Sequence, residues 1–120
     1  MGRRQRRREK RGGEAAAVET TAYTDPEGNV LMLRNSVSVG TVQKIRDLDS
    51  TPASSAEDRW QRRTELLFER FAVGWEIAGL PLETQNELLG RYRMASGDER
   101  RWIRDTIDAH VREHQPELAP

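Results

Sequence analysis

Residues 55–75 read SAEDRWQRRTELLFERFAVGW, and this stretch decides the fold because it predicts the main helix of the chain. Ser55 is followed three residues later by Asp58, which resembles the capping box that begins a helix. Apolar and aromatic side chains then recur at helical spacing, at Trp60, Thr64, Leu67, Phe68, Phe71 and Trp75. An extended or turning connector is expected over 75–81, because Leu80 precedes Pro81 and is biased away from helix.

Further helices are predicted on both sides of this stretch. A short helix is expected from Thr41 to Leu48, and a third helix is expected to begin at Pro81 or Leu82. The buried face of the third helix would consist of Leu82, Leu88, Leu89 and Tyr92. The last helix is predicted over 98–113 with Ser96 near its start, and residues 115–120 are expected to form a tail.

Residues 21–34 predict a β-hairpin. The sequence Asp25-Pro26-Glu27-Gly28 fits a type I turn, with Asp, Pro and Gly at the positions that favour them. The second flank, Val30-Leu31-Met32-Leu33, does not alternate, so both of its faces are apolar. A lone two-stranded sheet is marginal in water, so these faces must meet helices, another strand or another subunit.

The predicted fold is therefore α+β and mostly α, an N-terminal hairpin followed by three to four helices in a small bundle. Its expected organisation is a disordered basic arm at 1–20, a hairpin plus helical domain at 21–114 and the tail at 115–120. Hydrophobic residues make up 35% of the chain and charged residues 33%, which indicates a lean core. Such a chain is only marginally stable alone, and a homo-oligomer is expected.

The first residues form the most conspicuous charge cluster. Residues 1–13 contain seven basic residues and one acid, a net charge of +6, on a chain whose formal net charge is zero. The segment resembles arginine-rich RNA-binding peptides, so nucleic acid is one possible partner. A solubilising tail, or an arm that docks on an acidic protein surface, is the alternative. The candidate phosphate contacts are Arg3, Arg4, Arg6, Arg7, Arg8, Lys10 and Arg11.

Catalytic and metal-binding patterns are weak throughout the chain. There is no cysteine, no Gly-x-Ser-x-Gly turn and no phosphate-binding glycine loop. His110 and His114 have the spacing of a zinc pair, but Val111 stands where the HExxH pattern has Glu, so helix-end histidines are favoured. Core packing is favoured over base stacking for Trp60, Trp75 and Trp102. We therefore expect no enzyme, no metal and no cofactor.

The layout from Tyr23 to about Val111 resembles the tail assembly chaperones of long-tailed bacteriophages. The resemblance rests on the hairpin ending in VLMLR at 30–34, SVSV at 36–39, LLFERFAVGWEI at 66–77, GLPL at 79–82 and the Leu88-Leu89 helix. It implies a non-catalytic helical protein that oligomerises, coats the tape-measure protein and helps to recruit tail-tube subunits.

Three functions are thus open from the sequence: a tail assembly chaperone that binds tape-measure or tail-tube proteins, a nucleic-acid-binding protein, or a structural virion protein of the head or connector. No apolar run approaches the length of a membrane span, and a cytoplasmic location is expected, in the host if a phage encodes the chain. The residues expected to contact a protein partner are Val30, Leu31, Met32, Leu33, Trp75, Ile77, Leu80 and Leu82.

Overall fold

The predicted hairpin forms strands β1 (Thr20–Thr24) and β2 (Val30–Arg34), at the start of the residues that the computed structural model describes, 19–52 and 55–119. At its turn the Gly28 N–H donates to the Asp25 carbonyl oxygen at 3.0 Å. Gly28 has a φ of 86°, a left-handed conformation that glycine adopts without a steric cost. The Asp25 carboxylate also accepts hydrogen bonds from the N–H groups of Glu27 and Asn29.

Two further strands extend the hairpin into a sheet. Helix α2 (Ala56–Phe71) runs directly into β3 (Ala72–Ile77), and β4 (Leu80–Leu82) follows a turn at Ala78 and Gly79, both with positive φ. The prediction that Trp75 continues the helical stripe is therefore wrong. Ala72 is already extended, and the β-branched and aromatic residues that follow it pair with β2 instead of prolonging the helix.

The remaining helices are α1 (Val39–Asp49), α3 (Gln85–Arg93) and α4 (Gly97–His114). The first and the last confirm the predicted helices to within two residues. The third begins later than predicted, because Thr84 caps it: the Glu87 N–H donates to Thr84 Oγ1 at 3.2 Å, and the Thr84 N–H donates to Glu87 at 3.1 Å. Leu82 consequently lies in β4 and not on this helix.

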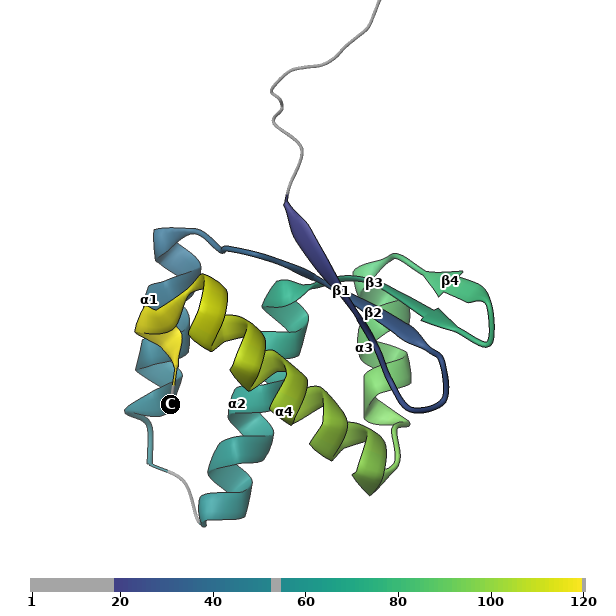
Figure 1. The fold of residues 1–120 in the computed structure, drawn as a ribbon. Helices are drawn as coiled ribbons and strands as arrows, with labels where there is room; N and C mark the ends of the chain where they lie inside the picture. Colours follow the sequence, from purple (N-terminus) through teal and green to yellow (C-terminus); the bar gives the residue numbers. More distant parts are fainter. Residues whose placement is uncertain (1–18, 53–54, 120) are drawn as a thin grey trace, which may run out of the picture.

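The fold is α+β and mostly helical, as predicted. The sheet is antiparallel with the strand order β1-β2-β3-β4, and its register shifts between Met32 and Leu33. Helix α2 is central, because it contacts α1, α3, α4 and β3, and α4 crosses it in Figure 1. The buried core joins both layers and consists of Leu31, Leu33, Val42, Ile45, Leu67, Phe68, Phe71, Trp75, Leu88, Tyr92, Ile103, Ile107, Val111 and Leu118.

The end of the chain is part of the fold, so the prediction of a tail from residue 115 is wrong. A short 3₁₀ helix, η1 (Pro116–Leu118), packs against α4 and α1. Its Leu118 side chain is only 2% exposed, and the Gln115 side chain accepts a hydrogen bond from the Val37 N–H at 2.8 Å. At the other end, the predicted basic arm lies outside the described residues up to position 18, and Thr20 already belongs to β1.

Candidate protein-binding surface

The two faces of the sheet differ in what covers them. Side chains alternate along β2, so Leu31 and Leu33 point to the inner face, where the helices bury them completely. Trp75 lies opposite Leu31 in the register and is buried on the same face. Val30 and Met32 point to the other side, which we call the outer face, and Met32 is 38% exposed there.

A shallow apolar groove runs along the outer face. It encloses about 200 Å³ and is lined by Val30, Met32, Gly74, Trp75, Glu76, Pro81, Leu82 and Glu83. Gly74 lies opposite Met32 in the register and forms the floor, since a Cβ at this position would contact Met32 Cε at 3.5 Å. The groove therefore exists because a glycine occupies this strand position. Leu80 does not line the groove: it pairs with Ile77, so its side chain is directed to the same side of the sheet as Trp75, where it is 69% exposed.

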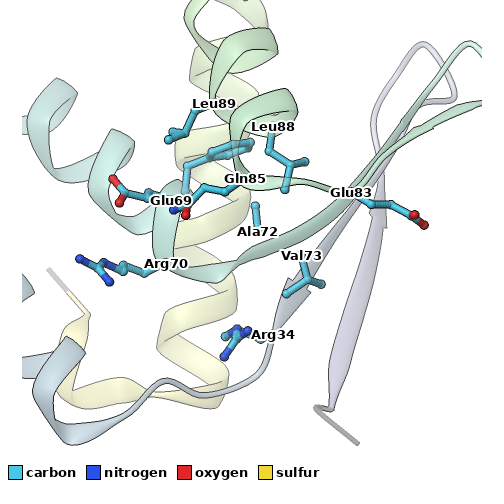
Figure 2. Close-up of a pocket in the computed structure, with 10 residues that line it drawn as sticks. Arg34, Glu69, Arg70, Ala72, Val73, Glu83, Gln85, Leu88 and Leu89 are labelled. Carbon is cyan, nitrogen blue, oxygen red and sulfur yellow. The ribbon is translucent and has the colours of Figure 1, made fainter.

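A second depression adjoins the groove where α2, β3 and α3 meet (Figure 2). It encloses about 370 Å³ and shares Glu83 with the groove. Leu88 and Leu89 from α3 supply apolar contacts, and the charged side chains around them are Arg34, Arg70, Glu69 and Glu83. Within the described residues, the buried Nε atoms of both arginines have no hydrogen-bond acceptor. Together the groove and this depression offer apolar contact area next to uncompensated hydrogen-bond donors.

The residues predicted to contact a partner are divided by the structure. Met32 is exposed and Val30 is half-buried on the outer face. Ile77 and Leu82 are half-buried against the core on the inner face, and Leu80 is exposed on that same side of the sheet. Leu31, Leu33 and Trp75 are core residues, so they present no surface to a partner in the folded chain. The reason is strand alternation: an apolar run in β2 supplies one face to the core and the other to the groove. The sequence analysis did not single out Gly74, Pro81, Arg34 or Arg70 as site residues.

The two histidines do not form a metal site. Their rings lie 4.5 Å apart, but His110 is buried and both of its nitrogens are occupied. Nδ1 lies 2.6 Å from the Tyr23 hydroxyl, and Nε2 lies 2.8 Å from the Arg34 carbonyl oxygen. The expectation of a helix-end surface histidine is therefore wrong for His110. In the described ranges, no group of three or more His, Asp or Glu side chains is placed to hold a metal ion.

Several carboxylates on the helices are paired with arginines. Glu65 accepts from Arg93 at 2.9 Å, and Asp98 pairs with Arg101 on the same helix. Glu99 pairs with Arg91 at 2.6 Å, and hydrogen bonds to Ser96 and Arg91 outweigh its burial and lower its pKa. Asp108 has a raised pKa because it is half-buried, but it lies on α4 away from the groove. Asp98 and Glu99 line one cavity, whereas Glu65 and Asp108 lie outside it.

The tryptophans occupy three different environments. Trp75 is in the core against Phe68, at 5.5 Å between ring centroids, which confirms the packing prediction for this residue. Trp102 is only half-buried and packs on the edge of the core. Trp60 is half-buried under Arg104, whose guanidinium carbon lies 4.9 Å from the ring.

Comparison of the chain with protein-family models, with curated proteins and with solved structures found no match. The groove on the outer face and the depression beside it are therefore the features that indicate a function. No helix in the described part of the chain has the length and apolar character that crossing a membrane requires. The seven basic residues predicted to contact nucleic acid, from Arg3 to Arg11, all lie outside the described residues.

Proposed function

We propose that the chain is a non-catalytic assembly protein of the tail-chaperone kind, which binds a segment of a tape-measure or tail-tube protein along the outer face of its sheet. The observation that carries this proposal is the groove over Gly74, lined by the exposed residues Met32 and Pro81. The layout that resembles the phage chaperones passes through the same residues, since VLMLR supplies β2 and GLPL supplies β4.

The size of the groove suits transient binding. A volume of about 200 Å³ accepts one or two apolar side chains, whereas stable interfaces bury a much larger continuous area. Burial of exposed side chains such as Met32 contributes roughly 25 cal/mol per Å² of apolar surface. A chaperone that releases its client after assembly needs binding of this moderate strength. Methionine also adapts to different client side chains, because its side chain is flexible and polarisable.

The depression next to the groove adds a polar recognition element. The guanidinium groups of Arg34 and Arg70 form no ion pair within the described residues. A client segment with an acidic residue next to its apolar side chains would satisfy both arginines. Charge-assisted hydrogen bonds of this kind are stronger than neutral ones, so they would set the register of the client in the groove.

Co-purification tests the proposal. The tagged chain is co-expressed with the tape-measure and tail-tube proteins of a long-tailed phage, and the retained proteins are quantified. We expect Met32→Glu to abolish retention, because it places a charge in the groove. Met94→Glu is the matched control, because Met94 is 81% exposed at the end of α3 and does not line the groove. Equal retention by both variants, or no retention by the unchanged chain, would exclude this surface as the client site.

Nucleic-acid binding through the arm is the second candidate, and it rests on the arginine-rich sequence alone. Phosphate contacts make such binding strongly salt-dependent. The test titrates RNA and DNA binding against salt for the chain and for a variant in which Arg6, Arg7 and Arg8 are replaced by Gln. If this variant binds RNA and DNA at low salt as strongly as the unchanged chain does, the arm is not the binding site and this candidate function is excluded.

A further inference from the structure

Within the described residues, strand β1 leaves one row of backbone groups without a partner. The Asn35 N–H donates to the Glu19 carbonyl oxygen at 2.8 Å, and the Asp25 N–H donates to the Asn29 carbonyl oxygen at the same distance. In an antiparallel pair the hydrogen-bonded positions alternate, so these bonds place Thr21 and Tyr23 at the positions that bond to β2. The N–H and C=O groups of Thr20, Ala22 and Thr24 therefore point away from β2. β1 is the edge strand, so nothing in the sheet receives them.

This edge lacks the features that usually block strand addition. Proteins protect edge strands with charges, prolines, bulges or short length. Thr20–Thr24 is five residues long, has no charged residue or proline, and pairs with β2 without a bulge. The opposite edge is protected, because β4 is three residues long and contains Pro81. The side chains of Thr20, Ala22 and Thr24 are all exposed.

We propose that β1 pairs antiparallel with the β1 of a second copy, about a two-fold axis at Ala22. Ala22 then lies opposite Ala22 of the partner subunit, and Thr24 lies opposite Thr20 of the partner subunit. Each of these positions has its backbone groups directed outward, so every pair exchanges two hydrogen bonds. The strand is self-complementary, as a two-fold interface requires, and threonines facing each other across strands are favourable.

The basic arm and an acidic cavity fit the same arrangement. The arm joins β1 at Glu19, and the β1–β2 turn begins at Asp25 at the other end of the strand. Antiparallel pairing places the start of one β1 beside the turn of the other. The arm of each copy is thereby directed over the turn of its partner. The single unfavourable meeting, Glu19 beside Asp25 of the partner subunit, is outweighed by the net charge of +6 over residues 1–13.

The cavity lies between that turn and the start of α4 and encloses about 340 Å³. Its carboxylates belong to Asp25, Glu27, Asp98 and Glu99, against one basic residue, Arg91, which is already paired with Glu99. The Glu27 carboxylate has no ion-pair partner in the described part of the chain. The cavity therefore has an excess of negative charge.

A guanidinium is the group that this cavity lacks. Its carboxylates outnumber its basic side chains, and an arginine of the arm would pair with Glu27, which has no ion-pair partner in the described residues. Arg11 is eight residues from Glu19, a span of up to about 27 Å when extended, so the arm can reach past the turn.

Chemical cross-linking tests the register. The chain has no cysteine, so Ala22→Cys and Thr24→Cys each introduce a single thiol into the full chain. In the proposed dimer the two thiols of Ala22→Cys face each other, whereas those of Thr24→Cys lie about 13 Å apart along the strands. We expect a short bis-maleimide to link Ala22→Cys into dimers and to leave Thr24→Cys largely unlinked. Equal yields, or no linked dimer with Ala22→Cys, would overturn the pairing.

Sedimentation of the full chain tests the interface in solution. We expect a dimer whose dissociation constant rises roughly tenfold or more in Ala22→Lys, because two like charges then lie opposite each other. Ala109→Lys is the matched control, since it adds the same charge to an exposed alanine of α4 and leaves the dimer unchanged. A chain that is monomeric at every concentration overturns the proposal, as does a dimer that tolerates Ala22→Lys.

The role of the arm is tested by charge reversal in the cavity. We expect Glu27→Lys to weaken the dimer and to reduce its sensitivity to salt, whereas Asp47→Lys on α1 does neither. Replacing Arg6, Arg7 and Arg8 by Gln should have the effect of Glu27→Lys. A dimer that responds to Ala22→Lys but not to these changes would overturn the arm–cavity contact. None of these residues lines the groove, so the result is independent of client binding.

Discussion

The Tyr23 hydroxyl lies 2.6 Å from His110 Nδ1, and this hydrogen bond joins the edge strand β1 to the last turns of α4. The second ring nitrogen of His110 faces the Arg34 carbonyl oxygen at 2.8 Å. A carbonyl oxygen only accepts, so Nε2 carries the hydrogen and Nδ1 accepts from Tyr23. The neutral imidazole thus connects both strands of the hairpin to the helical layer, and Phe71 packs edge-on against its ring.

Removing the tyrosine hydroxyl should weaken the fold. We expect Tyr23→Phe to lower the free energy of unfolding by about 1–2 kcal/mol, because it leaves a partly buried acceptor at Nδ1 without a donor. Urea denaturation measures the change. Tyr92→Phe is the control, since Tyr92 stacks on Phe68 and its hydroxyl makes no hydrogen bond in the described ranges. Equal losses in both variants would show that the Tyr23–His110 bond contributes little.

The same histidine should make stability depend on pH. Burial lowers the pKa of His110 below its ordinary value of 6.5, and the neighbouring His114 lowers it further, against the opposing effects of the Arg34 carbonyl and Glu113. Because the folded pKa is the lower one, the stabilisation is complete above about pH 6.5 and is lost as the pH falls through the folded pKa. Thermal unfolding from pH 7.5 to pH 5 should therefore show a falling midpoint.

A variant without this titration isolates the contribution of His110. His110→Gln should be less stable at pH 7.5 but should lose less of its stability on acidification than the unchanged chain. His114→Gln serves as the control: its side chain is not in the core, and burial is the largest cause of the lowered pKa of His110, so most of the acid-induced loss should remain. If acidification lowers the stability of His110→Gln as much as that of the unchanged chain, His110 is not the group whose titration destabilises the fold.

The C-terminal 3₁₀ helix should contribute to stability although it is only three residues long. Leu118 is 2% exposed, so Leu118→Ala is expected to cost about 2–3 kcal/mol through lost burial and the cavity that remains. Leu80→Ala is the matched control, because Leu80 is 69% exposed and its loss should cost little. Urea denaturation measures both variants. If Leu118→Ala unfolds at the same urea concentration as Leu80→Ala, the end of the chain does not pack against the core as described.

Gly74 can be enlarged without disturbing the fold. A Cβ at this position would meet Met32 Cε at 3.5 Å and the Leu82 carbonyl oxygen at 4.0 Å, which are ordinary contacts. Gly74→Ala should therefore raise the free energy of unfolding by about 0.5–1 kcal/mol, because glycine in a strand loses more conformational freedom on folding. Chemical denaturation of this variant measures the gain. A clear loss of stability would show that the strand cannot accept a side chain on its outer face.

The helical part of the fold could be predicted because its signals are local. Ser55 caps α2 by accepting from the Asp58 N–H, and Ser96 and Glu99 form the capping box of α4, as their spacing indicated. β3 was missed because no proline, glycine or other helix-capping residue stands where the helix ends and the strand begins, at Phe71 and Ala72. Only pairing with β2, a contact between distant residues, decides that the helix ends at Phe71.

The binding surface could be predicted only in part. The apolar run of β2 indicated two apolar faces, of which the structure covers one with helices, and the sequence placed Met32 of the other face among the contact residues. It could not separate Met32 from Leu31 and Leu33, because which face meets the helices depends on the register with β3. The groove itself depends on Gly74, whose significance appears only when Met32 is seen opposite it.

The most direct test of client binding at the outer face is the retention of the tape-measure and tail-tube proteins by two variants of Gly74. Gly74→Val fills the groove with a residue that favours strands, whereas Gly74→Ala adds only one methyl group. We predict that the immobilised Gly74→Val chain stays folded and loses its client, while Gly74→Ala retains most of it. Full retention of the client by a folded Gly74→Val chain would contradict the account.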